Sequence, residues 1–350
     1  MKKKEIPQAR LFLVISLIMI GLYFSNSVAS DGFSMIKPNQ PGINAQKIYS
    51  VAVDNNNTKW FLTELGIVSF NGEKWALQPN SAVQGKEVRD LTFDATTEGT
   101  GFWIATSAGL TSLKSMSDNA ATSFTTDNAT LISNDLRRVA IGANNIKWVG
   151  SSLGVAAYKG GKWLKPEYED TYPSLIFEAF PITSMVTSPG GDTLYVATEG
   201  AGVARVYQND VDGISGASEY AMWGPIIMPS DNVYSIHIDK KGAKWLGTEE
   251  GIAKHTGNNT LENWTVYTTA EGLVNNFVQA IISDQNGNVW FGTKGGISVF
   301  DGTKFTNYTK ANGLNSDNIL CLTVDKNGII WIGTDSGVNS FDKGTFNSFK

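Results

Sequence analysis

Residues 325–338 read DKNGIIWIGTDSGV, and related versions of this stretch recur along the chain. The recurring element is an aromatic residue followed three places later by Thr or Ser, and it returns about every 40 to 50 residues. The seven pairs are Trp60/Thr63, Trp103/Thr106, Trp148/Ser151, Tyr195/Thr198, Trp245/Thr248, Trp290/Thr293 and Trp331/Thr334. A Gly follows each aromatic residue by six places, or by seven at Gly202. An internal period of this length is typical of a repeat architecture.

Each repeat predicts four short β-strands joined by tight turns. The sixth repeat shows them most plainly, at residues 278–283, 289–293, 297–300 and 304–308. Its turn, residues 284–287, ends in a Gly, which readily takes the positive φ that such turns need. A unit of this size cannot bury both of its faces alone, so the units stack around a common axis. The sequence therefore predicts an all-β fold, a seven-bladed β-propeller of four-stranded antiparallel blades.

Two features of the repeat pattern leave the fold incompletely specified. Residues 32–37 and 345–349 both match a fourth strand, and one of them must complete the last blade, but the sequence does not say which. Residues 165–181 and 208–231 form connections longer than the rest, on either side of blade four. Long loops within a compact domain are often functional, so these two connections are candidate binding segments.

The first 30 residues have the order of a secretory signal peptide. Four basic residues stand within the first ten positions, an apolar run spans residues 11–24, and small residues follow up to Ser30. We predict cleavage after Ala29 or Ser30, which leaves residues 31–350 as a periplasmic or secreted propeller without stable membrane insertion. The alternative is an uncleaved anchor, although the apolar run is shorter than the roughly 20 residues that span a bilayer. No Cys lies near the cleavage site, which argues against a lipid-anchored lipoprotein.

Charge and cysteine content exclude some classes of partner. Residues 1–30 carry four positive charges and one negative charge, so their removal changes the formal net charge from -5 to -8. Nucleic acid is therefore not an expected partner, because its phosphates require a basic surface. Cys321 is the only cysteine and lies in the apolar segment 319–324, which predicts a buried, unreactive thiol. We expect a monomer that is stabilised by core packing.

The repeat resembles a known family. Residues 271–300, 312–319 and 325–338 are similar to the two-component regulator propeller repeat. The resemblance implies a propeller like those that form the periplasmic sensor half of hybrid histidine kinases, which help to detect glycan fragments. Such sensors continue into a further β-domain, a membrane helix and a kinase. Since this chain stops at Lys350, we expect no transmembrane signalling by the chain alone.

Two patterns could indicate catalysis, and each has a structural alternative. Residues 150–154 match the Gly-x-Ser-x-Gly nucleophile elbow, but they occupy the hairpin position of residues 292–296 in the repeat, so we expect a turn. His237 and His255 are the only histidines. Virginiamycin B lyase is also a seven-bladed propeller, and its activity depends on histidines and a metal. Here the strand of Trp245 separates the two histidines, so we do not expect them to converge. The sequence predicts no catalytic residue, no metal site and no cofactor.

Binding signals are better placed than catalytic ones. If the strands of each blade run outward from the axis, the residue after each repeat Thr or Ser and the residue near the start of each first strand share one face, the loop face. The ligand-binding candidates, which include aromatic residues of the two long connections, are Glu64, Arg89, Arg137, Tyr168, Tyr172, Glu199, Trp223, Tyr234, Glu249, Gln279, Lys294 and Asp335. Tyr49, Ser107, Ser152 and Thr183 complete the predicted polar ring. The alternatives are solvated loop positions and, for the aromatic residues, a small satellite core.

The pattern favours an exported, non-enzymatic propeller with a binding or sensory role. Aromatic rings stack on the apolar side of a pyranose and carboxylates accept its hydroxyl hydrogen bonds, so the candidate set suits an oligosaccharide. A partner protein on the loop face is the other expected ligand. The alternative functions are a lyase that acts on a polysaccharide or lactone through a histidine, and a scaffold for protein assembly.

Overall fold

The computed structural model describes residues 47–78, 83, 85–96, 101–116, 121–166, 180–208, 213–220, 228–257 and 262–349. All of them belong to one compact unit, Pro38–Lys350. The predicted signal segment and the N-terminal strand candidate, residues 32–37, lie outside the described residues. Among the residues that the structure describes, no helix is long and apolar enough to cross a bilayer.

The first four repeats form the first four blades. Blade one contains β1 (Ile48–Val53), β2 (Lys59–Thr63), β3 (Gly66–Phe70) and β4 (Trp75–Gln78). Blade two contains β5 (Val88–Asp94), β6 (Gly101–Thr106), β7 (Gly109–Leu113) and β8 (Thr122–Phe124). Blade three contains β9 (Leu136–Ile141), β10 (Lys147–Ser151), β11 (Gly154–Lys159) and β12 (Lys162–Pro166). Blade four contains β13 (Ile182–Thr187), β14 (Thr193–Thr198), β15 (Val203–Gln208) and β16 (Gly213–Tyr220).

The last three repeats form blades five to seven. Blade five contains β17 (Val233–Ile238), β18 (Lys244–Thr248), β19 (Ile252–His255) and β20 (Trp264–Tyr267), followed by the 3-10 helix η1 (Thr269–Glu271). Blade six contains β21 (Val278–Ser283), β22 (Val289–Thr293), β23 (Gly296–Phe300) and β24 (Phe305–Tyr308), followed by η2 (Lys310–Asn312). Blade seven contains β25 (Ile319–Val324), β26 (Ile330–Thr334), β27 (Gly337–Asp342) and β28 (Thr345–Phe349).

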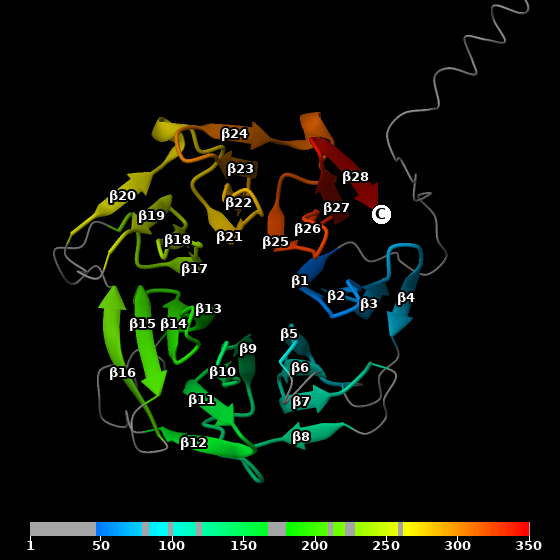
Figure 1. Cartoon of the computed structure of the whole chain (residues 1–350), viewed down its shortest axis with the longest axis vertical. Helices are drawn as coiled ribbons and strands as arrows, with labels where there is room; N and C mark the ends of the chain where they lie inside the picture. The colour runs from blue at the N-terminus through cyan, green and yellow to red at the C-terminus, as the bar shows by residue number, and fades with distance from the viewer. Residues whose placement is uncertain are drawn as a thin grey trace, which may run out of the picture. The chain divides into compact units, whose positions relative to one another are not determined.

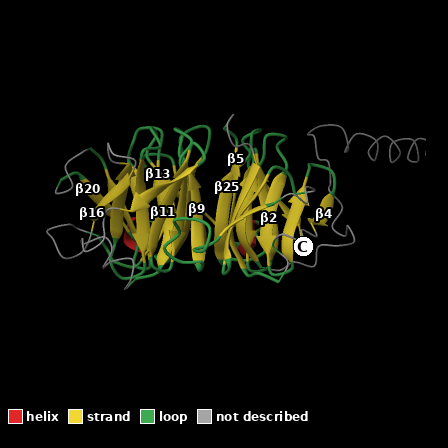
Figure 2. Cartoon of the chain, turned by 90° about the horizontal axis from the view of Figure 1, so that it is seen from below, coloured by secondary structure: helices red, strands yellow, loops and turns green. Residues whose placement is uncertain are grey.

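The predicted seven-bladed propeller is confirmed. Within each blade the four strands pair in sequence order and antiparallel, and the first strand of every blade faces the central axis (Figure 1). Seen from the side, the strands stand next to one another and the loops lie above and below them (Figure 2). Blade seven is complete with β28, so the C-terminal candidate, residues 345–349, is its fourth strand.

Blades three and four depart from the simple pattern. β12 pairs in parallel with β16 through Lys165↔Gly213 and Pro166↔Ile214, which joins the two blades into one eight-stranded sheet. β16 lies within the connection that the sequence predicts to be a loop, residues 208–231, so that prediction is wrong for residues 213–220. The segment reads GISGASEY and has one aromatic residue, Tyr220, whereas the fourth strands of blades six and seven have two each.

The hydroxyl of the repeat Thr or Ser closes the hairpin between the second and third strands. Thr293 Oγ1 donates to the Gly296 carbonyl oxygen at 2.8 Å and accepts from the Gly295 amide at 3.0 Å. Ser151 makes the same two bonds with Gly154 and Leu153, at 2.8 and 3.2 Å, and is 3% exposed. The expected turn at residues 150–154 is therefore confirmed, and Ser151 has a structural role.

The repeat aromatic residues fill the spaces between blades, as clusters that draw on two neighbouring blades show. Trp245 of blade five packs with Phe291 of blade six, with ring centroids 5.4 Å apart, and both side chains are fully buried. Burial of one such side chain contributes about 1.5 to 3 kcal/mol. Packing between blades therefore supplies much of the stability of the ring.

Candidate functional site

Each of the seven innermost strands has a β-bulge near its start. The register of β5 against β6 passes from Val88 to Asp90, so Arg89 lies between two paired positions without a partner of its own. The same shift occurs in all seven first strands. The bulged residues are Tyr49, Arg89, Arg137, Thr183, Tyr234, Gln279 and Leu320. A bulge turns a side chain away from the ordinary strand alternation, and bulges are frequent beside functional sites.

All seven bulged residues line a single cavity of about 700 Å³. The first strands surround the axis in Figure 1, and the bulges lie near their starts, so the cavity is the mouth of the central channel on the predicted loop face. Two carboxylates also line it, Glu64 of blade one and Glu199 of blade four, each directly after the second strand of its blade. The other charged residues of the lining are Lys86, Glu87 and Arg138. Its volume lies in the range of small-molecule sites. We call this cavity the channel mouth.

The structure brings together half of the predicted site residues. Those that line the channel mouth are Glu64, Arg89, Arg137, Glu199, Tyr234 and Gln279. Glu249, Lys294 and Asp335 follow the repeat Thr of blades five to seven but do not line the cavity. Tyr168, Tyr172 and Trp223 lie outside the described residues. Whether any of these residues binds a ligand stays a prediction.

Sequence reasoning did not include Leu320 or Arg138 among the candidates. Leu320 holds the same repeat position as Gln279, but its apolar side chain does not fit a ring that was predicted to be polar. Arg138 directly follows Arg137, and a regular strand would turn its side chain away from the axis. The shift in register between Leu136 and Arg138 changes this alternation, and both arginines line the channel mouth.

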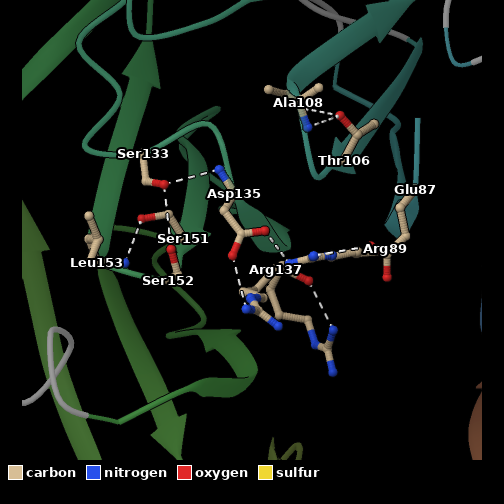
Figure 3. A network of polar contacts seen from close by, with 12 residues as sticks. Glu87, Arg89, Thr106, Ala108, Ser133, Asp135, Arg137, Ser151, Ser152 and Leu153 are labelled. Carbon is tan, nitrogen blue, oxygen red and sulfur yellow. Dashed lines mark hydrogen bonds and ion pairs between the residues drawn. The ribbon is translucent and has the colours of Figure 1, made fainter. Parts of the chain in front are cut away.

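Arginines of blades two and three form the basic side of the channel mouth (Figure 3). One carboxylate joins two of them, because Asp135 Oδ1 accepts from Arg89 and Asp135 Oδ2 lies 2.9 Å from Arg137 Nη2. Arg89 Nη2 also lies 3.2 Å from Glu87 Oε2. Arg138 Nε donates to the Thr183 carbonyl oxygen at 2.7 Å, and this bond holds Arg138 against the inner strand of blade four.

The side of blades four to six carries one carboxylate, Glu199, and is otherwise uncharged and partly aromatic. The Tyr234 hydroxyl donates to Glu199 Oε1 at 3.2 Å, and its ring packs at a tilt against Phe277 with centroids 4.5 Å apart. Burial, together with Glu199 and Glu249, raises the pKa of Tyr234 to about 12, so the hydroxyl remains a neutral donor at physiological pH. Lys294 lies outside the cavity, with its Nζ 3.4 Å from the centre of the Phe277 ring.

Hydrogen bonds hold the remaining side chains of blades five to seven. Gln279 Nε2 donates to Asn318 Oδ1 at 2.9 Å, and Asn318 Nδ2 donates to Asp335 Oδ2 at 2.9 Å. Burial alone would raise the pKa of Asp335, but hydrogen bonds from Ser316, Asn318 and Ser336 lower it. Asp335 therefore supports the channel mouth from behind Gln279, as a carboxylate that positions its neighbour.

The two histidines of blade five project to opposite faces of the blade. His237 pairs with Trp245 of β18, whereas His255 pairs with Lys244, the residue before it in the same strand. Successive residues of a strand point to opposite sides, and paired residues share a side. His237 Nε2 lies 2.8 Å from Ser283 Oγ in blade six, and the His255 ring lies against Trp264. The geometry agrees with the expectation that they do not converge. The described part of the chain holds no group of three His, Cys, Asp or Glu residues placed to bind a metal.

Comparisons with known proteins identify the repeat and the fold. Residues 272–295 and 313–336 match the family model of the two component regulator propeller. The extracellular domain of BT3049, described as a hybrid two component system of B. thetaiotaomicron, superposes with a TM-score of 0.72 at 24% identity over 87% of this chain and 40% of that one. A comparison with curated proteins gave no match.

Other propellers of known structure share the fold at lower identity. PorZ, a bacterial surface component of the type-IX secretion system of Porphyromonas gingivalis, has a TM-score of 0.66 at 16% identity over 91% of this chain and 48% of that one. A streptogramin B lyase has a TM-score of 0.61 at 13% identity over 89% of this chain and 97% of that one. The chain thus spans less than half of the first two relatives. It is a seven-bladed β-propeller whose sixth and seventh blades carry two-component regulator propeller repeats.

Proposed function

We propose that the protein is an exported binding or sensory propeller that holds an oligosaccharide at the channel mouth. One observation carries this proposal: seven β-bulges, one in each blade, turn seven side chains onto a single cavity of about 700 Å³. Side chains that serve only to pack the blades together are mostly apolar, like those between blades five and six. Six of these seven are instead polar or aromatic with a polar tip, and Leu320 is the exception.

The chemistry of the channel mouth suits a hydroxylated ligand. Glu64 and Glu199 can accept hydrogen bonds from hydroxyl groups, while Gln279 can donate and accept them. Tyr49 is 45% exposed, and Tyr234 lies on the same cavity, so both rings can contact the apolar face of a pyranose. The neutral state of Tyr234 favours this contact, because a phenolate would be solvated more strongly.

Export is supported by two observations of different kinds. The order of basic, apolar and small residues in residues 1–30 is that of a signal peptide, and the similar domain of BT3049 is extracellular. We therefore place the protein in the periplasm or outside the cell. The similar domain of BT3049 belongs to a hybrid two component system, and a sensory role for this chain is part of the proposal.

Thermal unfolding of the purified protein against a panel of soluble oligosaccharides tests the proposal. A ligand that binds only the folded state stabilises it by RT ln(1 + [L]/Kd), about 2.7 kcal/mol at a hundredfold excess over Kd. We expect one class of sugar to raise the midpoint, and Tyr234→Ala to abolish that rise. Tyr207→Ala is the control, because Tyr207 is an exposed tyrosine of a neighbouring blade that lies outside the channel mouth.

A partner protein on the loop face is the second candidate. Leu65 and Leu153 are 50% and 45% exposed, and they occupy the same position in the hairpins of blades one and three. Exposed apolar side chains beside a polar cavity are a feature of protein interfaces. Absence of a thermal shift with every sugar, together with one reproducible binding protein lost in a Leu65→Ser/Leu153→Ser variant, would favour this candidate.

A further inference from the structure

The charges at the channel mouth are unevenly distributed. Lys86 and Arg89 of blade two and Arg137 and Arg138 of blade three line one side, and the carboxylates paired with them are Glu87 and Asp135. Four positive and two negative charges leave blades two and three with an excess of two positive charges, and the same cavity also has the carboxylates of Glu64 in blade one and Glu199 in blade four. The bulged residues of blades five to seven are Tyr234, Gln279 and Leu320, which carry no charge.

The geometry of Asp135 shows what this basic side can bind. Its two carboxylate oxygens each accept from a different arginine, Arg89 on one and Arg137 on the other. Arginine side chains present several donors in a fixed plane, which matches the geometry of a carboxylate. Asp135 uses part of this donor set, and Arg89, Arg137 and Arg138 all line the cavity.

One donor of this set is still without an acceptor. Arg137 Nε is buried and makes no hydrogen bond within the described part of the chain, although the side chain as a whole is 37% exposed. A buried donor without an acceptor is unfavourable, and a shift of this partly exposed side chain that gives Nε a ligand oxygen would remove that penalty. The Nε of the neighbouring Arg138 is instead satisfied by a backbone carbonyl, which fixes its position before any ligand arrives.

We infer that the ligand of the channel mouth carries a carboxylate group, as an acidic oligosaccharide does. The carboxylate contacts Arg137, with Arg89 and Arg138 beside it, and the sugar ring extends toward Tyr234 and Gln279. This inference rests on the proposed function, because it names the chemical class of the same ligand. It adds charge recognition, which a site for neutral sugars does not require.

Isothermal titration calorimetry with two matched disaccharides tests the inference. Digalacturonic acid and galactobiose differ at C6, where the first has a carboxylate and the second a hydroxymethyl group. We expect the acid to bind at least tenfold more tightly at low ionic strength. The preference should shrink as salt is added, because a partly exposed charge interaction is screened.

Substitutions of Arg137 and of its partner Asp135 should change the affinity for the acidic sugar in opposite directions. Arg137→Gln should reduce the affinity for the acid to that of the neutral sugar, and Arg137→Lys should restore part of it. Asp135→Asn should increase the affinity for the acid several-fold, because it removes the carboxylate that competes for both arginines. Lys304→Gln is the control for net charge, because Lys304 is exposed on the outer turn of blade six.

The outcomes separate this inference from the proposed function. Equal binding of both sugars, abolished by Tyr234→Ala, would overturn the inference and leave the proposed function standing. An acid preference that survives Arg137→Gln would also overturn it. If neither sugar binds, the inference fails, and the proposed function is then decided by the panel of oligosaccharides. Tighter binding of the acid that follows the three substitutions as described would support both.

Discussion

His237 illustrates how burial between two blades, without any catalytic role, can shift the pKa of a side chain. Its ring lies between blades five and six, with Nε2 2.8 Å from Ser283 Oγ. Burial lowers its pKa to about 4, against a smaller opposing effect of Asp239. A histidine that stays neutral and faces a neighbouring blade is part of the packing between blades, since the channel mouth is lined by other residues.

This lowered pKa predicts a dependence of stability on pH. As pH falls through 6.5, the unfolded chain takes up a proton at His237, and the folded protein does not do so until pH is near 4. The contribution of neutral His237 to stability is therefore fully present above pH 6.5 and is lost between pH 6.5 and 4. Between pH 7 and 4.5, the wild type should lose about 2 kcal/mol more of its free energy of unfolding than His237→Gln. Urea denaturation at the two pH values measures this, and identical losses would contradict it.

At the scale of single elements, the turn between the first and second strands carries a specific network. In blade six, Asp284 accepts from the amides of Asn286 and Asn288, both at 2.9 Å, and from Trp290 Nε1 at 3.1 Å. One carboxylate thus closes the turn and fixes the aromatic side chain that fills the space between blades. Asp54, Asp239 and Asp325 do the same for the Trp residues six positions later.

Loss of this carboxylate should destabilise the protein more than loss of an exposed one in the same blade. Asp284→Ala removes the buried acceptor of two turn amides and of Trp290 Nε1, so we expect a loss of about 2 to 4 kcal/mol in the free energy of unfolding. Asp301 also caps a turn of blade six, between β23 and β24, but it is exposed, so Asp301→Ala should have a smaller effect. Chemical denaturation measures the free energy of unfolding of both variants. Equal losses would contradict a greater contribution from the turn between β21 and β22.

Strands and turns could be predicted from the sequence where particular side chains determine them. They could not be predicted where the pairing of backbone groups determines them. Trp290 packs between blades, and Thr293 and Gly296 close the hairpin between β22 and β23. Because these residue types are suited to those positions, the blade could be predicted from them. The bulge at Gln279 follows from the register of β21 against β22, and no side chain marks it. For the same reason, the pairing of β12 with β16 and the presence of Arg138 in the cavity were not predictable.

At the scale of the whole molecule, the ring closes between blade seven and blade one through side chains. Lys59 Nζ lies 3.6 Å from Asp325 Oδ2, and Lys326 donates from its amide to Asn57 Oδ1 at 2.9 Å. Phe61 and Trp331 pack across the same boundary, and Cys321 Sγ lies 3.7 Å from the Ile48 carbonyl oxygen. The seven-fold repeat predicted that these two blades meet, but the contacts that join them depend on tertiary positions that no local pattern specifies.

The single thiol reports on opening of this boundary. Burial raises the pKa of Cys321 to about 12, so a thiol reagent at pH 8 should react slowly with the folded protein and rapidly in denaturant. Lys59→Met leaves the buried Asp325 carboxylate without its lysine, which typically destabilises by about 3 to 5 kcal/mol, and should speed labelling of Cys321. Lys147→Met is the matched control, because Lys147 holds the same repeat position and pairs with Asp94 at 2.9 Å between blades two and three. If blade seven separates from blade one locally, only Lys59→Met accelerates labelling; equal acceleration by both would mean that the thiol is exposed by unfolding of the whole ring.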